Sequence, residues 1–275
     1  MRSEGLSESA IAAFGYSYSE LVGGSSGTIP ESSLRYSIFF LLERSNLIFP
    51  VYSPVSSLPD LERDINGVVT VNPALLQQTV VLKLNGGLGT SMGLDKAKSL
   101  LEVKGGNTFL DLTAKQVITM RKNFRSPIKF MLMNSFNTSK DTLSFLSKYS
   151  ALSDDPKLEL MQNKVPKVDK STLGPATWSV NKHLEWCPPG HGDLYTALYG
   201  SGQLDDLLAD GVKYMFVSNS DNLGATLDLG TAQHSTVHYS TVHLCHHLFH
   251  FHSSGDIVCL LAVCSFRFCS LILCC

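Results

Sequence analysis

Residues 79–93 read TVVLKLNGGLGTSMG, an apolar run that leads directly into a glycine-rich turn. Val80–Leu84 has the length and composition of a strand that is covered on both faces. The glycines at 86, 87, 89 and 93 would let backbone N–H groups approach a phosphate without a Cβ in the way. The spacing fits neither a Walker A loop nor the dinucleotide-binding fingerprint. Spacing alone leaves two interpretations open, a phosphate-binding turn and a simple tight turn between strand and helix.

The same strand pattern recurs along the chain, and predicted helices lie between the strands. Further strands are expected at 128–133 and 214–218, and each runs into polar residues at its carboxyl end. Helices are expected at 109–122 and 138–149, and one or two at 194–208. An N-terminal helix capped by Ser7 is expected to end at 23–24. This alternation predicts an α/β fold, with a mixed, mostly parallel sheet and helices on both faces. Ligands of such sheets bind at the carboxyl edge of the strands.

Two further segments place reactive side chains at turns. Residues 187–193, CPPGHGD, expose His191 beside a helix start, where an imidazole can meet an anion or a sugar hydroxyl. The alternative is a structural turn capped by Asp193. Residues 219–222, NSDN, follow the strand at 214–218 and present Asp221, which could hold Mg²⁺ on a nucleotide or merely close an Asx turn.

Composition excludes several classes of protein. The 275 residues carry 22 basic and 24 acidic side chains, so no surplus of positive charge favours binding to nucleic acid or to an anionic membrane. With 44% hydrophobic and 17% charged residues, the chain is not expected to be disordered. The N-terminus does not read as a secretory signal. Six of the seven cysteines lie beyond residue 230 and the remaining one is Cys187, which suits a reducing, cytoplasmic location.

Taken together, the motifs resemble a known enzyme family. Between Gln78 and Leu229 the chain carries, in order, LNGGLGTSMG with KS, FLDLTAKQ, FMLMNSFNT, LMQNKVPKV, PPGHGD and SNSDNLGATLD. This series resembles UTP–glucose-1-phosphate uridylyltransferase of the eukaryotic type, also called UDP-glucose pyrophosphorylase. The resemblance implies a nucleotide-sugar-transferase-like, Rossmann-like domain. It also implies the reaction of UTP with glucose 1-phosphate to give UDP-glucose and pyrophosphate, with Mg²⁺ as cofactor.

The resemblance also implies roles for individual residues. Lys98 and His191 would be the catalytic residues, and Asp221 would ligate Mg²⁺. The substrate contacts would come from Gly86, Gly87, His191 and Asn219. Nucleotide-binding residues would be Leu84, Asn85, Gly86, Gly87, Lys98, Gln162, Gly190, Asn219, Ser220 and Asp221, with Gln162 and the Gly190 backbone reading the uracil. The chain has Ala97 where many relatives have Pro, which is expected to loosen the loop without removing Lys98.

The resemblance divides the chain into three regions. Residues 1–77 are expected to form a helical and loop region with an aberrant insertion at 35–53. Residues 78–230 would be the N-terminal part of the catalytic domain, and 231–275 a tail that does not fold natively. The tail could be a zinc site, a membrane anchor at 257–275, or translated non-coding sequence, which the loss of Lys and Glu favours. A sheet without its later strands would keep an open edge, so the sequence predicts a truncated, poorly soluble and inactive chain.

Other functions remain open at this point. A UDP-sugar or UDP-N-acetylhexosamine pyrophosphorylase would use a related glycine loop. A non-catalytic nucleotide-binding relative with a C-terminal membrane anchor is the alternative outside the enzyme class. The expected partners are UTP and glucose 1-phosphate, with no nucleic acid and no membrane expected. The oligomeric state is left open.

Overall fold

A computed structural model describes residues 1–25, 73–89, 93, 96–227 and 258–261. The chain divides into two compact units, one of residues 1–14 and 71–275 and the other of residues 15–70. Helix α1 (Glu8–Val22) begins in the first unit and ends in the second. The predicted insertion at 35–53 lies outside the described residues, as does most of the predicted tail at 231–275. The description below concerns the first unit.

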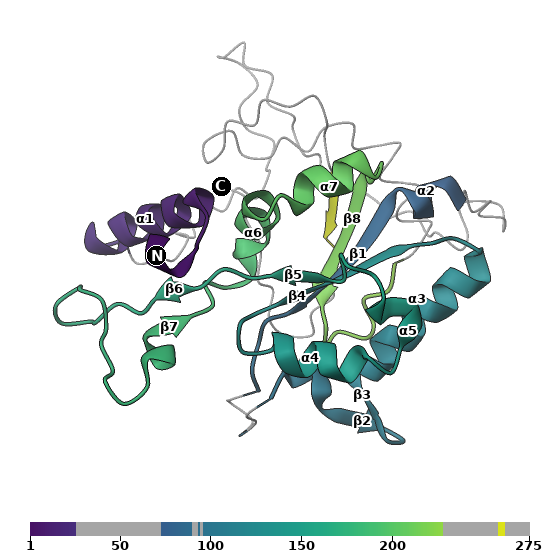
Figure 1. The fold of residues 1–275 in the computed structure, drawn as a ribbon, viewed down its shortest axis with the longest axis horizontal. Helices are drawn as coiled ribbons and strands as arrows, with labels where there is room; N and C mark the ends of the chain where they lie inside the picture. The colour runs from purple at the N-terminus through teal and green to yellow at the C-terminus, as the bar shows by residue number, and fades with distance from the viewer. Residues whose placement is uncertain (26–72, 90–92, 94–95, 228–257, 262–275) are drawn as a thin grey trace, which may run out of the picture. The chain divides into compact units, whose positions relative to one another are not determined.

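A parallel sheet forms the centre of this unit (Figure 1). Its strand order is β5-β4-β1-β8-β9, and every neighbouring pair is parallel. The strands are β1 (Thr79–Asn85), β4 (Lys129–Asn134), β5 (Glu159–Met161), β8 (Tyr214–Asn219) and β9 (Val258–Leu261). The strands predicted at 80–84, 128–133 and 214–218 are therefore confirmed as β1, β4 and β8. Because the pairs are parallel, all the carboxyl ends meet at one edge.

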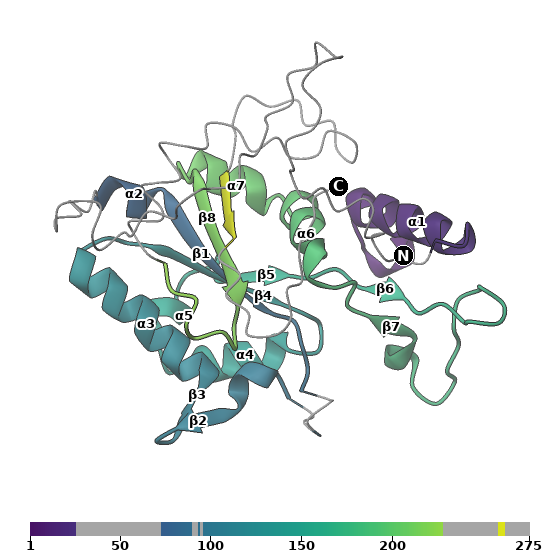
Figure 2. The same ribbon diagram turned by 180° about the vertical axis from the view of Figure 1, so that it is seen from behind.

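Helices cover both faces of the sheet, as predicted (Figures 1 and 2). All seven residues of β1 are buried, which explains why apolar residues point to both faces of the strand. Alternate residues point to opposite faces, so Val81 packs with the cluster that includes residues of α3 and α5, and Val80 with the cluster that includes residues of α6 and α7. The helices are α2 (Pro73–Gln77), α3 (Phe109–Phe124), α4 (Ser139–Leu146), α5 (Ser150–Ser153), α6 (Leu194–Gly200) and α7 (Gln203–Ala209).

Local capping explains where two of the helices begin. In α3, the Thr108 hydroxyl accepts a hydrogen bond from the Asp111 backbone N–H at 3.1 Å, and the Asp111 carboxylate accepts from the Thr108 N–H at 2.9 Å. This is a complete capping box. In α1, Ser7 Oγ accepts from the Ala10 N–H at 3.2 Å, which confirms the predicted cap.

The remaining described elements are short and were not predicted. They are the hairpins β2–β3 (Glu102–Lys104, Asn107–Thr108) and β6–β7 (Val165–Pro166, Trp186–Cys187), with the 3₁₀ turns Arg2–Glu4, Lys98–Leu100, Lys182–Glu185 and His191–Asp193. Among the described helices, none combines the length and the apolar character needed to cross a bilayer.

A fifth strand, β9, lies beside β8 and is the last strand on that side of the sheet. Val258–Leu261 forms β9 and pairs with Tyr214–Val217 of β8 in parallel register. These four residues belong to the segment 231–275, which was expected not to fold natively. An unpaired strand edge presents a row of free N–H and C=O groups. Pairing with β9 covers this side of β8, and β9 is then the edge strand of the described sheet, so the expected open edge stays a prediction.

Candidate nucleotide-binding site

The predicted phosphate and metal residues lie in contact at the carboxyl edge of the sheet. Lys98 opens a 3₁₀ turn, and its backbone N–H donates to Gly87 O at 3.2 Å. Its Nζ lies 2.5 Å from Oδ2 of Asp221, which follows the end of β8 by two residues. Ala97 has φ −52°, a value that a proline ring also imposes, so the substitution leaves a proline-like backbone in place. Residues 123 positions apart in the chain therefore share one site.

The glycine turn after β1 is fixed by its neighbours on both sides. Leu84 O accepts a hydrogen bond from the Ser220 N–H at 3.0 Å, which ties β1 to the segment that carries Asp221. Gly86 O accepts from Ser135 Oγ at 2.8 Å. A Cβ placed on Gly86 would lie 2.4 Å from Oε1 of Gln162, so only glycine lets the amide come this close.

Gln162 and Gly190, predicted to read the uracil together, are joined directly. Nε2 of Gln162 donates to Gly190 O at 2.6 Å. The Gln162 backbone N–H donates to Asn134 O at 2.7 Å, and the residue is only 4% exposed. Gly190 has φ +110°, a conformation that favours glycine. The Gln162 amide is thus held in a single orientation over the glycine turn.

His191 lies at the opening of the next helix, as its motif predicts. It begins the 3₁₀ turn His191–Asp193, which leads into α6. Desolvation by the surrounding protein lowers the pKa of His191, and the nearby Asp221 carboxylate partly opposes this shift. The imidazole is therefore favoured in its neutral form at neutral pH, where it can donate a hydrogen bond to an anion from one ring nitrogen.

The end of β8 presents Asn219 and buries Ser220. Asn219 is exposed at the last position of the strand, whereas Ser220 is 6% exposed. Asn219 O accepts from the Asn222 N–H at 3.2 Å, which turns the chain and sets Asp221 against Lys98. The Asn219 side chain is therefore accessible to a ligand at the carboxyl end of β8, and the turn places Asp221 beside it.

The side chain of Asn85 faces the interior rather than the edge. Its Nδ2 donates to Oδ1 of Asn134 at 2.7 Å and to Oγ1 of Thr142 at 2.9 Å. Asn134 Nδ2 in turn donates to Oε1 of Glu159 at 2.7 Å. Asn85 therefore begins a buried chain of polar side chains that links the carboxyl ends of β1 and β4 to the first residue of β5. Both amide hydrogens are used, so a ligand could meet this residue only through its backbone or its Oδ1.

Sequence reasoning missed the partners in this chain and the partner of Asp193. Asp193 was considered as a helix cap, but it accepts from the Asn163 N–H at 2.7 Å and from Asn163 Nδ2 at 2.9 Å. The Asp193 carboxylate also accepts a hydrogen bond from the Thr196 hydroxyl. Burial raises the pKa of the Asp193 carboxyl, and these hydrogen bonds oppose the shift. Asn163 lies in the motif LMQN and Asp193 in the motif PPGHGD, so the sequence pointed to both residues but not to the contact between them.

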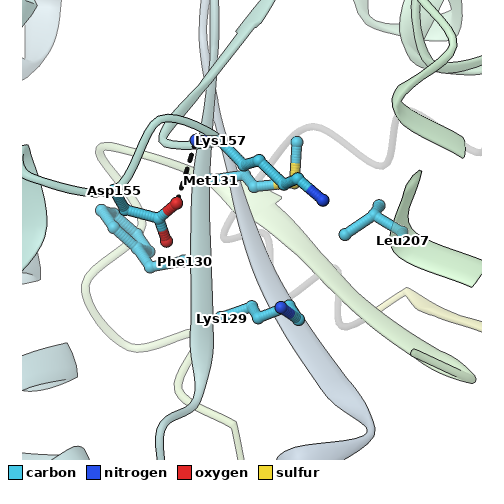
Figure 3. Close-up of a pocket in the computed structure, with 6 residues that line it drawn as sticks. All are labelled: Lys129, Phe130, Met131, Asp155, Lys157 and Leu207. Atoms are coloured by element: carbon cyan, nitrogen blue, oxygen red, sulfur yellow. Dashed lines mark hydrogen bonds between the residues drawn. The ribbon is translucent and has the colours of Figure 1, made fainter. Parts of the chain in front are cut away.

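A small pocket at the opposite end of the sheet holds none of the predicted residues (Figure 3). It is lined by Lys129, Phe130, Met131, Asp155, Lys157 and Leu207. Nζ of Lys129 and Nζ of Lys157 lie 3.0 and 2.9 Å from the same oxygen of Asp210. The two ammonium groups are therefore neutralised by protein carboxylates. This pocket gives no reason to move the candidate site from the carboxyl edge.

The donor set at the edge fits a metal that is bound largely through a ligand. Across the described part of the chain, no group of three His, Cys, Asp or Glu side chains gathers into a metal centre. Mg²⁺ commonly binds through one or two carboxylates together with substrate phosphates and water. A lone Asp221 paired with Lys98 suits that mode, because Lys98 supplies the positive charge when no cation is present.

Comparison with known proteins shows the family of the chain. The family model described as UTP–glucose-1-phosphate uridylyltransferase matches residues 56–243, more than half of the chain. The chain is 48% identical over 164 residues to the enzyme of that name from Saccharomyces cerevisiae, covering 59% of this chain and 33% of the relative. It is 46% identical over 161 residues to that of Solanum tuberosum, covering 58% of this chain and 34% of the relative.

Solved structures give the same assignment. The L281D mutant of UDP-glucose pyrophosphorylase from Leishmania major, in complex with UDP-glucose, matches with a TM-score of 0.73 and 47% identity. The match covers 86% of this chain and 45% of that one. The chain thus spans about a third of the curated relatives and under half of the solved structures that it matches. By its family match, its fold and its motifs, the chain belongs to the UTP–glucose-1-phosphate uridylyltransferase family.

Proposed function

We propose that the carboxyl edge of this sheet binds UTP and glucose 1-phosphate for uridylyl transfer, which yields UDP-glucose and pyrophosphate. The observation that carries this proposal is the contact of Lys98 with Asp221 beside the glycine turn of β1. A lysine that can neutralise phosphates and a carboxylate that can hold Mg²⁺ are there within one ligand's reach. Family membership supports the same reaction.

In this proposal the uracil is read by Gln162. Uracil presents an N–H donor between two carbonyl acceptors. The Gln162 amide offers Oε1 as acceptor and the second hydrogen of Nε2 as donor, because the first hydrogen goes to Gly190 O. The backbone from Leu84 to Gly87 would lie along the nucleotide, and the absence of a side chain at Gly86 gives it room beside Gln162.

The sugar phosphate would lie against His191 and Asn219. One of its ionised oxygens attacks the α-phosphorus of UTP in line, forming a new P–O bond while the bond to the pyrophosphate oxygen breaks. No general base is needed, because the nucleophile carries no proton to remove. Lys98 then neutralises charge on the phosphates, and His191 orients the nucleophile by a hydrogen bond. Mg²⁺, when bound at Asp221, would neutralise further charge on the triphosphate and its leaving group.

Binding of nucleotide to the 275-residue chain tests the proposal. Calorimetric titration in Mg²⁺ should show that UTP binds more tightly than CTP or ATP. Lys98→Met should weaken UTP binding about tenfold or more, because one charge-assisted contact to phosphate is lost. Lys213→Met is the matched control, since Lys213 is exposed at the amino end of β8 and should leave binding unchanged.

Two outcomes would overturn the proposal: equal affinities for the three nucleotides, or equal losses in Lys98→Met and Lys213→Met. Adding glucose, galactose or N-acetylglucosamine 1-phosphate to the UTP complex separates the glucose enzyme from the related pyrophosphorylases. That the chain by itself makes no UDP-glucose stays a prediction, and incubation with UTP, glucose 1-phosphate and Mg²⁺, followed by assay for UDP-glucose, tests it.

A further inference from the structure

A lysine is buried in the middle of the central strand. Lys83 is the fifth of the seven residues of β1 and is 3% exposed. Among the described residues, no carboxylate lies within ion-pair distance of its Nζ. Burial lowers the pKa of the Lys83 ammonium to about 8. A charged group in such a place is unfavourable for stability, and an apolar residue of similar volume often serves a core as well or better.

The Lys83 ammonium contacts both ends of the segment that carries Asp221. Its Nζ donates to Oγ of Ser218 at 2.7 Å and to the backbone O of Ala225 at 2.8 Å. Ser218 lies three residues before Asp221, within β8, and Ala225 lies four residues after it. A single cation therefore joins the strand before the Asp221 turn to the chain that leaves it.

Other bonds hold the same segment at single points. The Ser220 N–H donates to Leu84 O at 3.0 Å, and Nε2 of Gln116 in α3 donates to Leu223 O at 3.2 Å. Each of these fixes one position along the turn. Lys83 differs because it bridges the two ends, and a bridge of this kind sets the width of the turn between them.

We propose that Lys83 is a positioning residue that fixes the segment 219–225 and so holds Asp221 in place for the metal–nucleotide complex. Lys83 touches neither ligand in this proposal and acts through Ser218 and Ala225. The inference rests on the proposed function for its consequence in metal binding. Its structural half, the control of the turn by Lys83, stands without any ligand.

The first experiment measures metal binding in the presence of UTP. Mn²⁺ is titrated into the chain with UTP and followed by electron paramagnetic resonance, for the wild type, Lys83→Met and the control Lys129→Met. Lys129 lies on the adjacent strand, at the opposite end of the sheet, and pairs with Asp210. Lys83→Met should bind Mn²⁺ about tenfold more weakly, as expected for the loss of a charge-assisted hydrogen bond. Binding of UTP in EDTA should be unchanged.

A double variant separates positioning from general destabilisation. If Lys83 acts through Asp221, adding Lys83→Met to Asp221→Asn should weaken Mn²⁺ binding no further than Asp221→Asn alone. A Lys83→Met chain that loses UTP affinity equally in EDTA and in metal would overturn the proposal, because the damage would then be general. Ser218→Ala, which removes only one acceptor of the ammonium, should act in the same direction with a smaller loss.

The second experiment needs no ligand. Amide hydrogen exchange should be faster at Ser220, Asn222 and Ala225 in Lys83→Met and Ser218→Ala than in the wild type or Lys129→Met, while the amides of β4 keep their protection. Unchanged exchange at these three positions would refute the positioning role. A wild-type chain that fails to bind UTP would refute the proposed function instead, and the exchange result would still decide the role of Lys83.

Discussion

Replacing Gly86 with alanine tests how tightly the glycine turn and Gln162 are fitted together. An added Cβ would lie 2.4 Å from Gln162 Oε1, closer than carbon and oxygen can approach without bonding. The Gln162 backbone is fixed by its 2.7 Å bond to Asn134 O, so the side chain must swing away instead. That movement breaks the 2.6 Å hydrogen bond from Nε2 to Gly190 O.

The size of the effect follows from these contacts. The lost hydrogen bond is worth about 1 kcal/mol, and a forced departure from a relaxed rotamer adds about 0.5–1.5 kcal/mol. Gly190 is exposed, so water can satisfy its carbonyl and no further penalty arises there. We expect Gly86→Ala to lower the free energy of unfolding by about 2 kcal/mol. The displaced amide can no longer read the uracil, so the preference for UTP over CTP should fall at least tenfold.

Urea unfolding and calorimetric titration with UTP and CTP measure these two quantities. Gly15→Ala is the control: nothing lies within 4 Å of its added Cβ in α1, and it should leave nucleotide preference unchanged. The double variant Gly86→Ala with Gln162→Ala should match Gln162→Ala alone in nucleotide preference. The reasoning would be refuted if Gly86→Ala kept its full preference for UTP, or if the double variant lost more than Gln162→Ala.

Three other predictions concern stability. Burial lowers the pKa of Lys83 to about 8 from 10.5, so between these pH values the unfolded chain binds more protons than the folded chain. The free energy of unfolding of the wild type, relative to that of Lys83→Met, should therefore rise by up to about 3 kcal/mol as pH increases through this window. Urea titrations at each pH measure this difference, and a difference that does not change with pH would contradict the prediction. Gly200→Ala would place a Cβ 2.3 Å from Ser7 Oγ and 2.8 Å from Ser7 Cβ, so the segment that carries Ser7 must move away. Residues 1–14 should then be cut faster in limited proteolysis, and an unchanged rate of cleavage would contradict this contact. Phe130→Ala removes a side chain that is 1% exposed and should lower the free energy of unfolding by about 3–5 kcal/mol, and a loss below 1 kcal/mol in urea would contradict its place in the core.

The strands that carry the site could be predicted from sequence because each is a mostly apolar run that ends in polar or glycine residues. β1 is one residue longer than predicted at each end, β4 is shifted by one residue, and β8 is one residue longer at its carboxyl end. β5 was missed because it is three residues long and has no periodicity to detect. The two-residue strands of the β6–β7 hairpin were missed for the same reason.

Part of the site could be placed from sequence, but its contacts could not. Parallel strands bring their carboxyl ends to one edge, so the motifs around Lys98 and Asp221 were expected to be neighbours. Their ion pair depends on the turn that follows β8, which no local pattern specifies. The pairing of Asn134 with Glu159 depends on β4 and β5 being adjacent, which follows from tertiary packing. Lys83 looked like an ordinary strand residue until its burial and partners were known.

The buried chain of polar side chains that starts at Asn85 has a consequence for how this edge can vary. Glu159, Asn134, Asn85 and Thr142 are linked in series, and three of them are inaccessible to water or nearly so. Removing any one leaves a neighbour with an unmet donor or acceptor, at about 1–3 kcal/mol, whereas exchanging the whole set for apolar residues would leave none. Each single substitution in this chain of side chains therefore lowers stability. Designers who wish to change this buried polar chain should rebuild the four positions together.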